Sequence, residues 1–450
     1  MTSSLRLLAV CLAASISGTA TFARGETVDT LRPTIVDDET LTKTAEGPVV
    51  APTPKLTISP QEEQVAPKTS RQVTDPYAAQ GVKLGGIILY PSLEAGTLYT
   101  GNVAKASTGA QSDLGLYLKP SLRFESDWIR HSWTGQASGD LTAYLKNSGL
   151  NSKQAAASSK FRLDIRHTTR AEFEASYALE QAGSENSEVP DTAIGNRTSH
   201  TLSASAAIVH DFGGLEGRAK LGIERQIFED VALSGGGTED NSDRNNYTPS
   251  LGLRLTYTDP PALKPFVELI YAPRFHDKKR DRNGLRRNSQ GLTASLGIAL
   301  DRDPIWSGEA ALVYSVRSYE DPALDANDAI GINGNLTWNP TDLTSVVMTL
   351  ATTLNESSSA TSSGTKTWSG RVDVNHEMRE NVNLLGGLGL ALDKGSSGTD
   401  KTISSTLGVE WQINPNLAWT ASYDGTWLRA ASSSDNYNDQ RLMTGIVLRR

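Results

Sequence analysis

The side chains that could carry catalysis are few and widely scattered along the 450-residue chain. The six histidines are His131, His167, His200, His210, His276 and His376. They form neither an H-x-x-x-H nor an H-E-x-x-H zinc pattern, and no G-x-S-x-G segment supplies a nucleophilic serine. The single cysteine, Cys11, lies in the N-terminal apolar run, so a processed chain would hold no thiol. We therefore expect no catalytic residue, no enzyme activity and no cofactor.

Acidic residues could instead bind a metal in one loop. Glu239, Asp240 and Asp243 lie beside Gly235–Gly237 and could hold calcium, although a solvated loop is the simpler interpretation and we predict no metal site. The net charge of −8 and the lack of a basic stripe argue against a nucleic-acid partner.

The remaining charged side chains recur at alternate positions of long stretches, most clearly in Tyr247–Tyr257. Leu251, Leu253 and Leu255 alternate there with polar residues, and Arg254 lies in the middle of the polar set. A strand directs successive side chains to opposite faces, so one face is apolar with tyrosine at both ends. Ten steps of roughly 3.3 Å, tilted by about 40°, span roughly 25 Å, the apolar height of an outer-membrane barrel.

About eighteen such stretches follow one another, which predicts an all-β, transmembrane, antiparallel up-and-down barrel. We place them at 83–99, 113–126, 129–145, 159–168, 170–181, 198–211, 215–229, 246–258, 264–276, 289–301, 305–319, 328–339, 342–355, 365–377, 381–393, 401–414, 416–429 and 437–449. Short turns such as Asn414-Pro415-Asn416 alternate with long polar links such as 147–158 and 230–245. A secreted propeller or a set of sandwiches is the alternative, but those folds have short loops at both ends.

If the apolar face meets lipid, the polar face lines a lumen. The candidate lumen-lining residues are Arg123, Arg162, Arg166, Arg218, Lys220, Arg254, Glu268, Arg274, Glu309, Arg317, Arg371, Asp373, Glu410 and Asp424. The candidate aromatic girdle consists of Tyr247, Tyr257, Trp338, Trp411, Trp419 and Trp427. Arg166 and Glu172 could pair across their hairpin. A charged wall can select ions or solutes, and the arginines favour an anionic solute; the alternative is that these charges only pair and hydrate the wall.

The N-terminal 80 residues have a different texture. Residues 1–24 resemble a secretory signal, with cleavage expected after Ala20 or Ala23; a lipoprotein anchor at Cys11 is the less favoured alternative. Residues 25–80 are rich in proline and poor in aromatics, which predicts a disordered periplasmic arm. We expect this arm to be a spacer or a tether for a partner, and residues 81–450 to form the barrel.

Two segments near the start of the predicted barrel carry a family resemblance. The segment Asp75–Gly85 reads D-P-Y-A-A-Q-G-V-K-L-G, and Ile88–Gly96 reads I-L-Y-P-S-L-E-A-G. Together they resemble the outer-membrane β-barrel porins of α-proteobacteria. The resemblance implies an outer-membrane barrel, with some members linked to exopolysaccharide secretion, and it carries over no catalytic residue. One departure is the C-terminal Arg450, where outer-membrane barrels commonly end in an aromatic residue read by the assembly machinery.

The expected function is therefore a porin-like channel for hydrophilic solutes in the outer membrane of a Gram-negative bacterium. The alternatives are a dedicated export pore for an acidic exopolysaccharide, a non-conducting surface or structural barrel, and, least favoured, a membrane hydrolase. The expected partners are outer-membrane lipid, the barrel-assembly machinery and polysaccharide-secretion components that bind residues 25–80. An even strand number would leave the arm and Arg450 on the same, periplasmic side.

Overall fold

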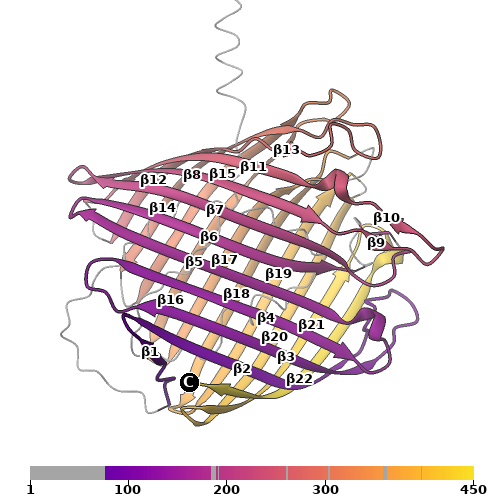
Figure 1. Cartoon of the computed structure of the whole chain (residues 1–450), viewed down its shortest axis with the longest axis horizontal. Coiled ribbons are helices and arrows are strands. Elements are labelled where there is room, and N and C mark those ends of the chain that lie inside the picture. Colours follow the sequence, from indigo (N-terminus) through magenta and orange to yellow (C-terminus); the bar gives the residue numbers. More distant parts are fainter. Residues whose placement is uncertain are drawn as a thin grey trace, which may run out of the picture.

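Eighteen long strands in the described part of the chain close into one antiparallel barrel (Figure 1). The computed structural model describes residues 77–183, 189–190, 192–259, 262–302, 305–357, 362–396 and 398–450. The wall strands are β2 (Ile87–Thr100), β3 (Asp113–Ser126), β4 (Ser132–Tyr144), β5 (Ser152–Arg166), β6 (Thr169–Ala182), β7 (Arg197–Asp211), β8 (Leu215–Phe228), β11 (Asn246–Tyr257), β12 (Leu263–Tyr271), β14 (Ser289–Arg302), β15 (Trp306–Tyr319), β16 (Asn327–Thr341), β17 (Thr344–Asn355), β18 (Thr365–Arg379), β19 (Val382–Gly395), β20 (Gly398–Asn414), β21 (Leu417–Arg429) and β22 (Tyr437–Arg449). The predicted fold class and strand number are confirmed.

Smaller elements decorate the barrel within the same described ranges. They are the strands β1 (Val82–Leu84), β9 (Val231–Ala232), β10 (Thr238–Glu239) and β13 (Phe275–His276), and the short 3-10 helices η1 (Ser148–Leu150), η2 (Ser242–Arg244) and η3 (Ser433–Asp435). The predicted signal sequence and most of the predicted arm lie outside the described residues. None of the described helices is long and apolar enough to cross a bilayer.

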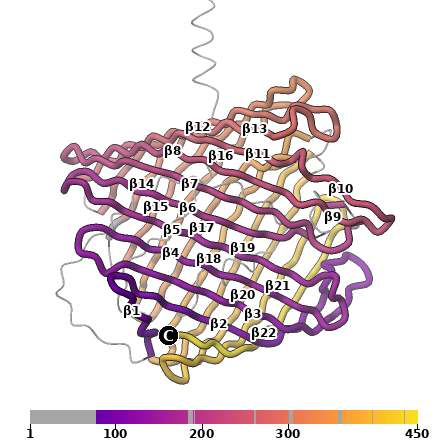
Figure 2. The backbone as a smooth tube through the Cα atoms, viewed as in Figure 1, coloured from indigo at the N-terminus to yellow at the C-terminus, as the bar shows by residue number. Residues whose placement is uncertain are grey.

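The barrel closes where the first wall strand meets the last. β2 pairs with β22 in antiparallel register, with Ala95 opposite Ile446. Each remaining wall strand pairs with its sequence neighbours, as the continuous tube in Figure 2 shows. Closure leaves no wall strand with an unpaired edge, which lipid could not hydrogen-bond.

The two ends of the barrel differ. We call the end with short links, such as 212–214, 342–343 and 415–416, the turn end. The other end carries longer links, such as 101–112, 229–245 and 277–288, and we call it the loop end. β9 and β10 extend from the loop end, whereas β1 and the marked C-terminus lie at the turn end (Figure 1).

Three predicted strand limits were clearly wrong. Residues 83–99 do not form one strand, because β1 ends at Leu84 and pairs with β2, which begins at Ile87. Residues 147–158 do not form a long link, because β5 already begins at Ser152. The run Ala155–Ala157 has small side chains on both faces, so period-two contrast is absent from the sequence there. The predicted strand 264–276 is interrupted after Tyr271 and resumes as β13. Pro273 lies in the interruption, and proline cannot donate to a sheet ladder.

The two faces of the wall have opposite chemistry. On β11, Leu253 is 50% exposed on the outside, whereas its neighbour Arg254 is 2% exposed and points inward. β20 repeats the pattern, with Leu407 exposed outside and Thr406 buried inside. The outer apolar face matches the hydrocarbon of a bilayer, and the polar groups are collected on the inner face.

Glycines let large side chains lie flat against the inner wall. Tyr117 on β3 lies over Gly96 and Gly445, and its hydroxyl donates to Glu94 at 2.7 Å. Phe266 on β12 covers Gly297 in the same way. Because glycine has no Cβ, these side chains pack on the wall instead of projecting from it.

Candidate functional site: the inner wall

Arg254 is the centre of one inner-wall cluster. Its Nη2 lies 2.8 Å from Oε2 of Glu309, although β12 and β14 separate their strands, β11 and β15. Its guanidinium carbon lies 3.5 Å from the ring centroid of Phe266, so the guanidinium group packs against that ring. A paired, stacked guanidinium of this kind has a fixed position and little freedom to follow a passing solute.

A second cluster bridges β6 and β8. Glu172 on β6 forms ion pairs with Arg170 and with Arg218 of β8, and Lys220 of β8 pairs with Glu174. These long side chains cross β7, whose opposing residues are small: Ala207, for example, lies opposite Glu172 and Lys220.

The predicted pair between Arg166 and Glu172 is wrong. The register shifts between Asp164 and Arg166, so Arg166 lies opposite Thr169 at the exposed turn end. Arg162 is the residue opposite Glu172, and its Nε pairs with Asp164 at 2.9 Å. Arg166 directly precedes the two-residue turn 167–168, whereas Glu172 lies further along β6, so the two residues are not cross-strand partners.

A third cluster lines β18, β20 and β22. Arg371 pairs with Asp373 at 2.7 Å on its own strand, and its Nη2 donates to the Thr406 hydroxyl at 3.3 Å. Arg449 pairs with Glu410 at 3.1 Å near the turn end. These contacts fall on the same inner face as the other two clusters.

The structure places most of the candidate wall residues on this inner face. Those nearly or fully buried are Arg218, Lys220, Arg254, Arg274, Arg317, Arg371, Asp373, Glu410 and Asp424. Those partly exposed are Arg123, Arg162, Glu268 and Glu309. Arg123 pairs with Glu125 at 3.0 Å. Carboxylates thus accompany the wall cations at short range, so the wall does not present a continuous field of positive charge.

The six candidate girdle residues lie on the outer face near the two ends. Tyr247 and Trp427 lie at the loop end, and Tyr257, Trp338, Trp411 and Trp419 lie at the turn end. Trp338 stacks on Trp306 with centroids 5.5 Å apart.

Sequence reasoning missed an aromatic chain at the turn end. The ring centroids of Phe124 and Trp133 lie 5.0 Å apart, and those of Phe161 and Phe173 lie 6.2 Å apart. Trp128 contacts both Trp133 and Phe161. Trp133 and Phe161 are direct cross-strand partners, so strand pairing combined with parity could have found them.

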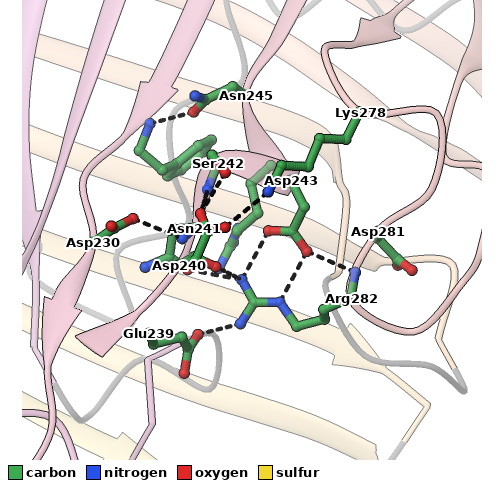
Figure 3. A network of polar contacts seen from close by, with 12 residues as sticks. Asp230, Glu239, Asp240, Asn241, Ser242, Asp243, Asn245, Lys278, Asp281 and Arg282 are labelled. Atoms are coloured by element: carbon green, nitrogen blue, oxygen red, sulfur yellow. Dashed lines mark hydrogen bonds and ion pairs between the residues drawn. The ribbon is translucent and has the colours of Figure 1, made fainter. Parts of the chain in front are cut away.

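The carboxylates of the acidic loop form ion pairs with basic side chains (Figure 3). Arg282 pairs with Asp243 at 2.9 Å and with Glu239, and Lys278 pairs with Asp240 at 2.8 Å. The described residues contain no cluster of His, Cys, Asp and Glu suited to a metal ion. The calcium interpretation is therefore replaced by a bridge between the links 229–245 and 277–288.

The charges of this bridge are mutually stabilised. The hydrogen bond from Lys278 lowers the pKa of Asp240 below its ordinary value. Burial raises the pKa of Asp243, but the hydrogen bonds from the side chain and backbone of Arg282 outweigh it and hold that pKa low. Both carboxyls are therefore anionic at neutral pH and bind their cations fully.

A closed barrel with an apolar exterior and a charged, hydrogen-bonded interior defines the class of outer-membrane β-barrels. Within that class, the chain belongs to the family described as putative beta-barrel porin 2, whose model matches residues 75–450. The broad expectation of a porin-type barrel is thereby confirmed.

Solved outer-membrane barrels are similar to this chain in fold. OpdK from Pseudomonas aeruginosa is 13% identical over 80% of this chain and 99% of its own, with a TM-score of 0.37. The siderophore receptor PirA from Acinetobacter baumannii is 8% identical over 80% of each chain, with a TM-score of 0.41. The siderophore receptor PiuA from the same organism is 10% identical over 82% of each chain, with a TM-score of 0.41. No curated protein matches the sequence.

Proposed function

We propose that the protein is a channel through which hydrophilic solutes cross the outer membrane. The observation that carries this proposal is the inner wall, where charged and hydroxyl side chains gather while the apolar residues face outward. Barrels of about 16–18 strands are wide enough to enclose an aqueous channel. Side chains that lie flat over glycines, such as Tyr117 over Gly445, further favour an open path.

The proposed channel discriminates weakly between small ions. Arg254, Arg218 and Arg371 each lie within ion-pair distance of a carboxylate, so the field of each pair falls off quickly. This distribution supports a general channel for hydrophilic solutes over a pore built only for polyanions.

The proposed orientation has the turn end in the periplasm. β1 and Arg450 both lie at the turn end, and short turns in this class face the periplasm. The arm that follows the expected signal cleavage site would then lie on the periplasmic side, where secretion components could bind residues 25–80.

Single-channel recording tests this proposal. We expect the refolded chain to give large, stable conductance steps in a planar bilayer and a reversal potential near zero in a salt gradient. Arg254→Glu should move the reversal potential towards cation preference. A barrel that inserts but never conducts would overturn the channel and favour a structural barrel or a partner-dependent export pore.

Deleting residues 25–80 separates those alternatives. A channel of the proposed kind should conduct without the arm, because its wall is complete from β2 onward. Loss of polymer secretion in cells, with intact conductance in bilayers, would instead support the export pore.

A further inference from the structure

One carboxylate at the loop end lies in a basic site built by distant strands. Glu356 follows β17, and its Oε1 lies 3.1 Å from Nη1 of Arg274, which precedes β13. The Ser289 hydroxyl of β14 donates to the same oxygen at 3.2 Å. Oε2 lies 3.4 Å from Nε2 of His276. Glu356 thus reaches past β16 and β15 to its partners.

The site holds more donors than one carboxylate uses. Nη1 of Arg317 lies 4.0 Å from Oε1 of Glu356 and donates to Ser289 at 2.8 Å, which orients that hydroxyl. The side chains of Arg274, His276 and Arg317 are 4%, 5% and 2% exposed. Nδ1 of His276 is buried without a hydrogen-bond partner. Two guanidinium groups, an imidazole and a hydroxyl therefore converge on one anionic group.

The balance of charge keeps this site basic. Glu224 of β8 is the second carboxylate that influences Arg274, and it also accepts a hydrogen bond from Ser203. Burial raises the pKa of Glu356, but Arg274, His276 and Arg317 outweigh it and hold that pKa well below its ordinary value. Glu356 is therefore anionic, as a carboxylate ligand of this site would be.

The backbone beside Glu356 has separate anchors. Arg287 donates to the carbonyl oxygens of Ser357 and Ser362, and the Tyr319 hydroxyl donates to the carbonyl of Ser363. These contacts hold the ends of the link without using the Glu356 carboxylate. The carboxylate can therefore leave by side-chain rotation while the backbone keeps its place.

We propose that Arg274, His276, Ser289 and Arg317 form a binding site for the carboxylate group of a solute, which Glu356 occupies when no solute is bound. This inference rests on the proposed channel function and names the class of solute that the loop end selects. Exchange of one carboxylate for another conserves the charge-assisted hydrogen bonds, so the site is never left empty in the barrel interior.

Glu356 is attached to the chain beside its site. Its effective concentration there therefore sets the concentration that a free carboxylate needs in order to compete. Short tethers give effective concentrations of about millimolar, so we expect a free carboxylate to displace Glu356 only in that range. Removing the Glu356 carboxylate should then reveal much tighter binding at the same residues.

Calorimetric titration of the refolded full chain with succinate, in detergent, tests the site. We expect Glu356→Ala to bind succinate at least about tenfold more tightly than the unchanged protein. The matched control is Glu320→Ala, which removes an exposed loop-end carboxylate that pairs with Arg286 and should leave affinity unchanged. Succinamide, which lacks the charges, should bind neither variant.

Second-site variants decide whether the named residues form the site. Adding Arg274→Gln or Ser289→Ala to Glu356→Ala should abolish the gain in affinity, and two independent positions guard against one misfolded variant. The inference is overturned if Glu356→Ala binds no more tightly than the unchanged protein, or if both double variants retain the gain.

The binding assay is independent of conductance. A conducting barrel that gains no affinity for succinate would remove the carboxylate site and leave the proposed channel standing. A barrel that binds succinate tightly but never conducts would retain the site and remove the channel.

Discussion

Arg254 and Glu309 form an ion pair of 2.8 Å across the inner face of two intervening strands. The Arg254 side chain is 1% exposed and that of Glu309 is 15% exposed, so the lumen reaches one partner only. Phe266 fills the space between the guanidinium and the wall. The pair therefore joins β11 to β15 as a cross-brace that backbone hydrogen bonds alone do not supply.

The first prediction follows from this pair. Arg254→Gln should lower the free energy of unfolding by roughly 1–3 kcal/mol, because Glu309 keeps its charge and loses its partner. Urea titration of the folded fraction measures the change. Lys366→Gln is the control, because the pair between Lys366 and Asp328 is more exposed and should contribute less than about 1 kcal/mol. Equal losses in the two variants would contradict the cross-brace.

The second prediction concerns the closure seam between β2 and β22. A Cβ atom at Gly96 would overlap the carbonyl oxygen of Thr444, a backbone atom that cannot rotate away. Gly96→Ala should therefore destabilise the barrel by about 3 kcal/mol, as overpacking does in a fixed site. The fraction that resists unfolding in denaturant is the measurement.

Gly101 provides the matched control at the same seam. Its backbone N–H bonds to Gln440, but a Cβ there would meet only ordinary contacts, the nearest at 3.7 Å. Gly101→Ala should leave stability within about 0.5 kcal/mol of the unchanged protein. A loss as large as that of Gly96→Ala would mean that the seam tolerates no side chain for a reason other than overlap.

The third prediction is a pH dependence of the loop bridge around Arg282. The pKa values of Asp240 and Asp243 are lowered in the folded protein. A lowered pKa means that the stabilisation is fully present above the ordinary value of about 4 and is lost as pH falls through the folded value. The bridge should therefore be unchanged between pH 7 and pH 5 and loosen only below about pH 4.

Spin labels can follow that bridge. Ser234→Cys and Asn283→Cys place one label in each of the two links, and the label distance should stay narrowly distributed until the pH falls below about 4. Adding Asp243→Asn should broaden the distribution already at pH 7. A distance that broadens between pH 7 and pH 5 would contradict the assignment, because neither carboxyl titrates there.

The sequence was sufficient to predict which residues lie on the outer face and which lie on the inner face of the barrel wall. Apolar and polar residues alternate in Tyr247–Tyr257 because successive side chains face lipid and lumen in turn. The sequence therefore shows a period of two. The run Ala155–Ala157 carries no such contrast, and the start of β5 was misplaced. The turn at residues 167–168 is also shorter than its sequence suggests, which is why Arg166 was paired with a residue too far along β6.

The partners within the wall could not be predicted from the sequence. Arg254 meets Glu309 and Glu172 meets Arg218, although other strands lie between the members of each pair. Such contacts depend on the side-chain rotamer and on whether the intervening strand has a small residue at the crossing point. The Glu356 cluster could not be predicted from the sequence either, because its members come from links and strands far apart in the chain.

The fourth prediction uses a glycine to change the channel without unfolding the barrel. A Cβ at Gly387 would overlap Nη2 of Arg371 and lie 2.6 Å from Oδ1 of Asp373, both ends of flexible side chains. Gly387→Ala should therefore fold normally and push the guanidinium away from the wall into the lumen. We expect lower single-channel conductance and a reversal potential shifted towards anions, because Arg371 would lose its 2.7 Å contact with Asp373.

Two comparisons make this fourth prediction decisive. Gly386→Ala, one residue away where a Cβ meets nothing within 4 Å, should leave both conductance and selectivity unchanged. Combining Gly387→Ala with Arg371→Ala should restore the conductance, because the displaced guanidinium is gone. If Gly387→Ala alone conducts as the unchanged protein does, Arg371 does not border the conducting path, and the inner wall at β18 and β19 contributes structure but not selectivity.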